Sequence, residues 1–191
     1  MEPSSANCYP GTTVLVNKFD IRDDVKRSEV EAVLVSARSA EWMSKPLCSS
    51  FDFQRYREIH RYLFADLYDW AGMLREINIS KKGTLFCPAA ELSTRSQLIF
   101  HRLSENNCFC GLGHDAFVEQ LLDFYCVTNE LHPFREGNGR TQGIFLTQLI
   151  ENAGYHIDFA DIDSDLLMLA SIQSSQGVTD LLRSILMDAI T

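Results

Sequence analysis

The chain has 191 residues, of which 46% are hydrophobic and 23% charged, and its formal net charge is −9. This length and apolar content can bury one sizeable core, so we expect a single domain over residues 1–191 and exclude extended disorder. The acidic balance argues against a broad contact with nucleic acid, which needs a basic face to neutralise backbone phosphates. The acidic charge does not exclude a nucleotide bound in one local pocket.

The sequence lacks signals for membrane insertion or export. No run approaches the roughly 18 consecutive apolar residues of a membrane helix, and the start, Met-Glu-Pro-Ser-Ser, has no basic segment followed by an apolar one. The six cysteines are scattered, and the close pair Cys108 and Cys110 lacks a second pair at zinc-site spacing. We therefore expect a soluble cytoplasmic protein with unpaired thiols and no contact with a membrane.

Turn-forming residues and a short apolar run occupy the first part of the chain, so residues 1–22 are predicted to form an arm that lies on the domain. A helix is predicted to begin near Asp23 or Asp24, because residues 29–42 tolerate helix well. It should end at Lys45-Pro46, since proline breaks the pattern.

Apolar side chains next recur at spacings of three and four, the stripe of an amphipathic helix. They are Tyr56, Ile59, His60, Leu63, Phe64 and Leu67. This helix is predicted to end near Trp70-Ala71-Gly72. From residue 74 to residue 88 apolar and polar positions alternate around Lys82-Gly83, which indicates a hairpin.

Helical spacing returns for the rest of the chain. It predicts helices over residues 91–106, 115–130, 140–152, 165–174 and 179–190. The 140–152 helix should stop at Ala153-Gly154. No internal repeat and no domain linker is visible, so the fold is expected to be all-α, with one short hairpin.

One loop between two of these helices carries the chemistry. Residues 132–140 read His-Pro-Phe-Arg-Glu-Gly-Asn-Gly-Arg and open directly into a predicted helix. Unpaired amides and the positive end of the helix dipole favour an anion there. His132 can accept a proton from an attacking hydroxyl. Glu136 can hold magnesium together with substrate phosphates, and Arg140 can fork onto phosphate oxygens.

Ordinary structural roles compete with this interpretation. A lone histidine is most often a cap or a core residue, and Gly137-Asn138-Gly139 alone is a common turn. A dinucleotide-binding loop is excluded because no strand precedes these residues and Gly143 falls at the wrong spacing. No GxxxxGK[ST] sequence occurs, which excludes a P-loop. Phe134 is expected to anchor the loop to the core.

The loop matches the HPFx[D/E]GNGR motif of the Fic family, whose members transfer AMP from ATP to protein hydroxyls. Residues 59–64, 68–72 and 75–81 resemble the family's segments ahead of its active site, and residues 9–12 and 17–19 resemble the amino-terminal arm of bacterial members. The resemblance therefore covers most of the chain. It implies a mainly helical fold, which agrees with the predicted helices.

The resemblance also implies roles for individual residues. His132 would be the general base, and Glu136 would hold magnesium between the phosphates of ATP. Asn138 and the amides around Gly137 and Gly139 would form an anion hole, and Arg140 would contact the distal phosphates.

In the family a hairpin flap beside the site captures the target backbone as an added strand. It corresponds here to residues 79–88. Its predicted docking residues are Ser80, Lys81, Lys82, Gly83, Thr84, Leu85 and Phe86.

One position departs from the family pattern. The fuller motif continues GNGRxxR, and the second arginine is replaced by Gly143. In the family this arginine contacts the γ-phosphate and orients ATP. Its loss removes a charge-assisted contact of about 1.5 to 3 kcal/mol, so weaker or misoriented ATP binding and slow transfer are predicted. Another basic residue filling the gap is the competing interpretation.

Regulation and partners follow from the resemblance alone. Thr147 to Asn152 fits the letters of the inhibitory [S/T]xxxE[G/N] motif, but it lies inside the helix after the loop and is treated as a coincidence. The chain thus resembles toxin members that are inhibited by a separate small antitoxin protein. Relatives of these toxins modify DNA topoisomerase subunits, which the resemblance suggests as a target class. A phosphotransferase, a transferase of another nucleotide, and a nucleotide- or protein-binding module without transfer remain the alternatives.

Overall fold

The computed structural model describes residues 7–47, 50–81 and 84–191, and within them the fold is mainly helical, which confirms the predicted class. The α-helices are α1 (Asp24–Met43), α2 (Phe53–Phe64), α3 (Leu92–Glu105), α4 (His114–Leu131), α5 (Asn138–Asn152), α6 (Ser164–Ser174) and α7 (Asp180–Ala189). The short elements are β1 (Ser80–Lys81), β2 (Thr84–Leu85) and the 3-10 helices η1 (Ala89–Glu91), η2 (Asn107–Phe109) and η3 (Phe159–Asp161).

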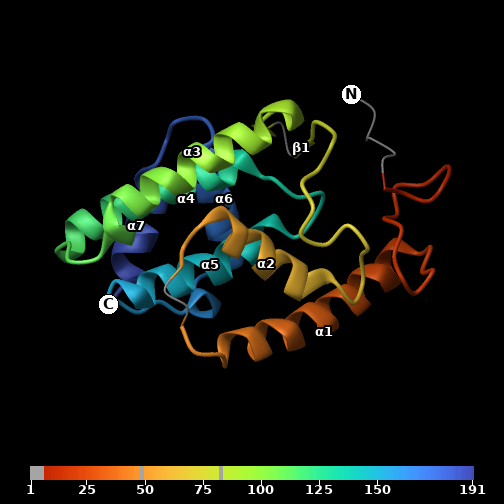
Figure 1. The fold of residues 1–191 in the computed structure, drawn as a ribbon, viewed down its shortest axis with the longest axis horizontal. Coiled ribbons are helices and arrows are strands. Elements are labelled where there is room, and N and C mark those ends of the chain that lie inside the picture. The colour runs from red at the N-terminus through yellow and green to blue at the C-terminus, as the bar shows by residue number, and fades with distance from the viewer. Residues whose placement is uncertain (1–6, 48–49, 82–83) are drawn as a thin grey trace.

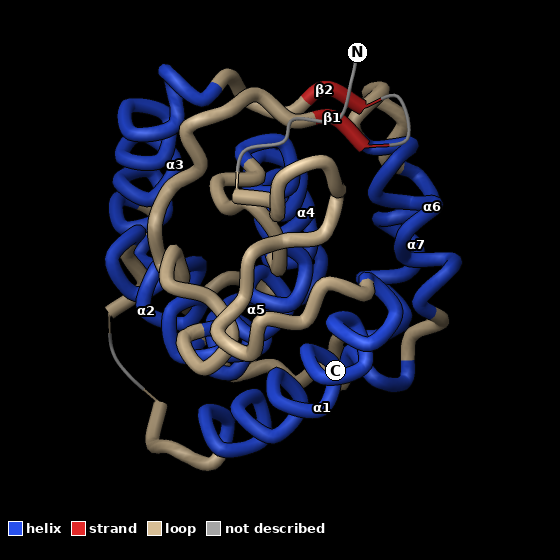
Figure 2. Tube along the Cα trace, turned by 90° about the vertical axis from the view of Figure 1, so that its right-hand side faces the viewer, coloured by secondary structure: helices blue, strands red, loops and turns tan. Residues whose placement is uncertain are grey.

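Helix α5 lies in the middle of the molecule and packs against α2 and α4 (Figure 1). Helix α1 covers α2, while α3, α6 and α7 pack on α4. The β1–β2 hairpin lies at one end of the bundle, beside α6 (Figure 2). The loop between α4 and α5 is therefore enclosed by elements from both halves of the sequence.

Acidic side chains cap the starts of α1 and α2. Asp23 accepts a hydrogen bond from the amide of Lys26 at 2.9 Å and begins α1, as predicted. Asp52 caps α2 in the same way through the amide of Arg55, at 2.7 Å. A carboxylate at this position satisfies an amide that has no partner within the helix, and it also complements the helix dipole.

The predicted end of α2 is wrong, because the helix stops at Phe64 rather than near Gly72. The amides of Leu67 and Tyr68 both bond the carbonyl of Phe64, which closes a turn. Leu67 and Tyr68 are nevertheless buried in the same core. The apolar spacing continues beyond the helix because the turn folds these side chains back onto it.

The hairpin is confirmed but is shorter than predicted. Its pairs are Ser80 with Leu85 and Lys81 with Thr84, and the predicted Lys82-Gly83 turn lies outside the described residues. Just outside the two strands, the amide of Phe86 donates to the carbonyl of Ile79 at 3.4 Å. The next amide, that of Cys87, donates to the carbonyl of Glu130 near the end of α4 at 2.9 Å.

The described part of the predicted arm, residues 7–22, packs on the domain. Cys8 and Leu15 form an isolated antiparallel bridge, and the side chains of Tyr9 and Leu15 are buried. The amide of Lys18 donates to the carbonyl of Leu67 at 2.9 Å. In the described parts of the chain, the helices are too short or too polar to cross a membrane.

Candidate active site

His132 ends α4 in a left-handed conformation, with φ 41° and ψ 60°. Such a conformation is uncommon for a residue other than glycine and needs support from its surroundings. The support comes from Arg75, a buried residue whose Nε donates to the His132 carbonyl at 2.8 Å. The amide of Arg75 also donates to the carbonyl of Pro133 at 2.9 Å. The root of the flap thus fixes the backbone of the histidine.

The imidazole of His132 is set as a neutral base. Its Nδ1 lies 3.3 Å from the carbonyl of Asn129, and because a carbonyl only accepts, Nδ1 carries the proton. Nε2 is then the unprotonated nitrogen. Burial lowers the pKa of His132 to about 4, and the positive charges of Lys81 and Arg75 act in the same direction. The ring of Phe86 stacks on the imidazole with centroids 3.8 Å apart.

The loop of residues 132–137 is anchored on α2. Phe134 is fully buried and stacks on His60, with ring centroids 3.8 Å apart. The Nδ1 of His60 accepts from the amide of Gly72 at 2.8 Å, so its Nε2 carries the proton and donates to the carbonyl of Glu136 at 2.9 Å. Burial lowers the pKa of His60 to about 4, which keeps this tautomer neutral.

Asn138 closes the loop through its side chain. The side-chain oxygen accepts from the amide of Phe134 and the side-chain nitrogen donates to the carbonyl of Phe134, both at 2.9 Å. Both polar groups of this side chain are therefore used, and the predicted contribution of Asn138 to an anion hole falls to its backbone amide. The helix begins at Asn138, two residues earlier than predicted. The amides of residues 138–140 occupy its first turn, where no intrahelical carbonyl can pair with them.

The two motif glycines differ in what they need. Gly137 has φ +79°, and a Cβ built on it would lie 2.2 Å from Cζ of Phe64. No other residue type fits there without moving the core. Gly139 has an ordinary φ, and a Cβ at this position meets no atom within 4 Å.

Two charged residues of the motif lie side by side. One side-chain oxygen of Glu136, Oε1, accepts from the amide of Gly137 at 2.9 Å and lies 3.5 Å from Nη2 of Arg140. Within the described residues the other oxygen, Oε2, has no hydrogen bond or ion pair. No group of three or more histidine, cysteine or acidic side chains in these ranges could hold a metal by itself. One available carboxylate oxygen fits magnesium that takes its remaining ligands from phosphates and water.

Two adjoining cavities open at this loop. The first has a volume of about 210 Å³ and is lined by His132, Glu136 and Phe86 among others. The second, of about 540 Å³, shares Gly139 and Gln142 with it and extends past Gly143. Among the residues lining the second cavity, Arg140 is the only basic one. The lining therefore offers no other basic side chain in place of the missing arginine.

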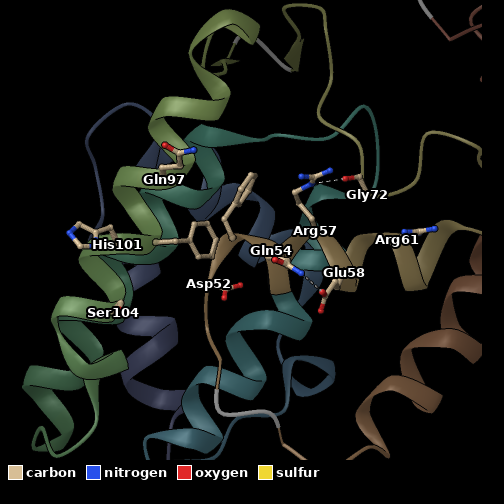
Figure 3. A pocket seen from close by; sticks show the side chains of 11 residues that line it. Asp52, Gln54, Arg57, Glu58, Arg61, Gly72, Gln97, His101 and Ser104 are labelled. Atoms are coloured by element: carbon tan, nitrogen blue, oxygen red, sulfur yellow. Dashed lines mark hydrogen bonds between the residues drawn. The ribbon is translucent and has the colours of Figure 1, made fainter.

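A larger cavity of about 690 Å³ lies between α2 and α3, where Arg57, Glu58 and His101 line its walls (Figure 3). It shares no lining residue with either cavity at the loop. The Nε of Arg57 already donates to the carbonyl of Gly72, at 2.9 Å. The loop residues predicted from the sequence, His132 and Arg140 among them, line the two smaller cavities instead.

The described flap residues lie over the loop. Thr84 Oγ1 is 3.1 Å from Ser175 Oγ, at the end of α6, and Leu85 exposes 74% of its surface. Lys81 and Phe86 face the cavity that holds His132, while Ser80 pairs with Leu85. The predicted docking residues Lys82 and Gly83 lie outside the described residues.

Sequence reasoning missed several residues that build the site. His60 and Phe64 appeared in an apolar stripe and in a resembling segment, and Arg75 in another such segment, none of them with a role at the site. Glu31, from α1, was not singled out, yet its Oε1 lies 2.6 Å from Nη2 of Arg140. A buried carboxylate within an otherwise ordinary helix carries no local pattern that could have revealed this contact.

Comparisons with known proteins agree with the geometry. The family model described as Fic/DOC family matches residues 50–150. The chain is 34% identical over 183 residues to the "Probable protein adenylyltransferase Fic" of Salmonella typhimurium, covering 96% of this chain and 90% of that protein. It is 33% identical over 182 residues to the protein adenylyltransferase VbhT of Bartonella schoenbuchensis, covering 95% of this chain but only 38% of VbhT.

Solved structures show the same architecture. The BepC protein of Bartonella tribocorum, a VirB-translocated effector solved with bound AMPPNP, superposes with a TM-score of 0.93 at 26% identity. That match covers 100% of this chain and 99% of the BepC chain. An N-terminal Fic domain of a Bartonella quintana effector, solved with bound ADP, gives a TM-score of 0.94 at 25% identity, covering 99% of this chain and 96% of that one.

The glycines provide a direct test of the loop geometry. Gly137→Ala should destabilise the fold, because a left-handed φ costs a non-glycine residue about 1 to 3 kcal/mol and the new methyl group overlaps Phe64. Gly139→Ala is the matched control and should leave the free energy of unfolding within about 0.5 kcal/mol of the parent. Chemical denaturation measures both values. Equal stabilities of the two variants would show that the Phe64 contact does not constrain position 137.

Proposed function

The chain belongs to the Fic/DOC family, and on that premise we propose that it is a protein adenylyltransferase that transfers AMP from ATP to a hydroxyl side chain of a target protein. The observation that carries the proposal is the position of His132. Its Nδ1 lies 3.3 Å from the carbonyl of Asn129, which leaves Nε2 as the unprotonated nitrogen, and the residue lines a cavity that also reaches Gly139, in the first turn of α5. A base and an anion site thus share one space of about 210 Å³.

The transfer step follows from this arrangement. The target hydroxyl gives its proton to Nε2 of His132 as its oxygen attacks the α-phosphorus of ATP. The new oxygen–phosphorus bond forms while the bond from the α-phosphorus to the oxygen bridging to the β-phosphate breaks. Pyrophosphate leaves, and AMP remains on the target as a phosphodiester. The neutral state of His132 at pH 7 makes it competent for the first event.

The rest of the loop serves the phosphates. The amides of residues 138–140 and the positive end of α5 stabilise phosphate oxygens, and Arg140 adds charge-assisted donors. Magnesium, if bound, would be held by Glu136 and would neutralise phosphate charge. Its fit rests on the free carboxylate oxygen of Glu136.

We propose that the target docks through the flap. Strand β2 is short and exposed at Leu85, and a flap of this kind can accept an extended segment by main-chain pairing. The added segment would run past Phe86, whose ring stacks on the imidazole of His132. Its hydroxyl would thereby reach His132. DNA topoisomerase subunits enter as a target class by family resemblance only.

A separate antitoxin is also proposed as a partner. The one sequence match to an inhibitory motif, Thr147 to Asn152, lies within α5, where a continuous helix keeps it from folding back over its own start. With Gly143 in place of the second arginine, such an inhibitor would have to act without the usual ion pair. Isolation from the native host as a consistently lone chain would count against this partner.

Gly143 also supports a second candidate activity. Among the described residues that line the cavity there, only Arg140 is basic, so the γ-phosphate lacks the second basic contact that would fix the orientation exposing the α-phosphorus. A reversed nucleotide would present its terminal phosphate to the hydroxyl, which would make the chain a phosphotransferase. If the nucleotide were bound in neither productive orientation, the chain would be a module that binds nucleotide or protein without transfer.

Labelled ATP distinguishes these functions. In host lysate, adenylyl transfer predicts incorporation of an α-phosphate label and none of a γ-phosphate label. His132→Ala should reduce this incorporation by at least about 100-fold, the size of a lost general base. Incorporation of the γ label would favour the phosphotransferase, and the absence of both labels would favour the binding module.

Restoring the arginine tests the departure from the motif. Gly143→Arg should bind ATP more tightly and transfer faster by about tenfold or more, because it restores a charge-assisted contact at a position where a Cβ meets nothing within 4 Å. Gly143→Gln is the control, since it adds a long polar side chain without charge. Steady-state kinetics with both variants decide the matter: equal rates for Gly143→Arg and the parent would sink the idea.

The pKa of His132 predicts where kcat/KM falls at acid pH. Burial lowers the pKa of His132 to about 4, so the imidazole stays neutral and able to accept a proton until the pH falls toward that value. The ratio kcat/KM should therefore hold from neutral pH to about pH 5 and then fall. Far-ultraviolet circular dichroism at each pH controls for unfolding. A limb centred near pH 6.5, the ordinary histidine value, would contradict the burial argument.

A further inference from the structure

Glu31 is a buried carboxylate that joins α1 to the phosphate end of the site. It is 4% exposed. Its Oε1 accepts from Nη2 of Arg140 at 2.6 Å. The other oxygen accepts from Nη1 of Arg27 at 2.8 Å and from the hydroxyl of Tyr68. Two arginines and a phenol therefore converge on one carboxylate.

These contacts form a chain that runs from the exposed side of α1 to the motif loop. Arg27 is itself held by Asp24, through Nε at 2.9 Å. Burial and the bond to Glu31 raise the pKa of Tyr68, so its hydroxyl stays protonated and donates. At the inner end Arg140 reaches Glu136 at 3.5 Å. Glu31 thus joins Arg27, on the outer side of the network, to the motif residue Arg140.

The guanidinium of Arg140 is held at one nitrogen, while some of its donors remain available. Its Nη2 bonds Glu31, and its central carbon lies 4.8 Å from the ring centroid of Phe64. In the described part of the chain, Nε and Nη1 have no hydrogen-bond partner. One corner of the planar group is thus fixed while two sets of donors remain for a ligand, which is how an arginine is prepared for bidentate contact with phosphate.

Stability gives a weaker reason for this arrangement. Buried ion pairs often contribute little compared with apolar side chains of the same volume, because desolvation offsets their attraction. A carboxylate that fixes an arginine beside an anion site contributes orientation instead. The orientation carries more weight here because Gly143 leaves Arg140 as the only basic residue lining the adjoining cavity.

We propose that Glu31 is a positioning residue of the active site: by holding Nη2 of Arg140, it directs the remaining donors of that arginine toward the phosphates of the nucleotide. The inference rests on the proposed function for its ligand, a nucleoside triphosphate. Glu31 acts through Arg140 and does not touch the nucleotide.

A double-mutant cycle on nucleotide binding tests the inference. Binding of AMPPNP is measured by calorimetry for the parent, Glu31→Gln, Arg140→Gln and the double variant. Glu31→Gln should weaken binding about tenfold, the scale of a misdirected charge-assisted hydrogen bond. In the Arg140→Gln background the same change should have no further effect, because the group that Glu31 positions is absent.

The controls separate positioning from folding. Glu41→Gln removes an ion pair with Arg38 elsewhere on α1, outside this network, and should leave binding unchanged. Thermal unfolding is followed for every variant, and Glu31→Asp replaces Glu31→Gln if the latter does not fold, since its shorter side chain keeps the charge but cannot bridge both arginines. In transfer assays, the KM for ATP should rise in Glu31→Gln with kcat changed less than about threefold.

Three results would overturn the inference. Equal weakening by Glu31→Gln in both backgrounds would assign Glu31 to the fold alone. Unchanged binding would remove any role at the site, and tighter binding would mean that Glu31 withholds Arg140 from the phosphate. A parent that binds AMPPNP but transfers nothing refutes the proposed transferase function and still leaves the binding cycle to decide the role of Glu31.

Discussion

The contact between α2 and the loop of residues 132–137 is the constraint on which the rest of the site depends. His60 is central to it, since it stacks on Phe134 and donates to the carbonyl of Glu136. Phe64 adds a steric limit, because its ring leaves space only for glycine at position 137. Irregular backbone at a buried position is stable only where its polar groups find partners. Here a neutral histidine and the side chain of Asn138 supply them.

Two residues from other parts of the chain, Arg75 and Glu31, contact the polar groups of this loop and of the helix that follows it. Arg75, at the root of the flap, bonds the carbonyl of His132 and so couples the flap to the base. Glu31, on α1, bonds Arg140 and couples the outermost helix to the anion end. Each acts over a sequence separation of more than fifty residues. The proposed catalytic groups are close in sequence, while the groups that contact them are dispersed.

The absence of an arginine at position 143 changes the charge of the site but not its backbone architecture. Helix α5 passes through this position without distortion, and the cavity beside it remains open. Under the proposed function, the charge missing at Gly143 would lie at the far end of the nucleotide pocket. The orientation of bound ATP would then depend on Arg140 and the amides of the helix start.

The sequence by itself determined the helical class, most helix boundaries, the hairpin and the loop of residues 132–140. These features are local: spacing, capping carboxylates and a short motif lie within a few residues of one another. It overran the end of α2 because Leu67 and Tyr68 are buried beyond the helix. Only the tertiary structure decided the tautomers of His60 and His132, the use of the Asn138 side chain, and the pairing of Glu31 with Arg140. Those depend on which carbonyl, ring or carboxylate a distant segment brings within hydrogen-bond distance, and no local pattern encodes that.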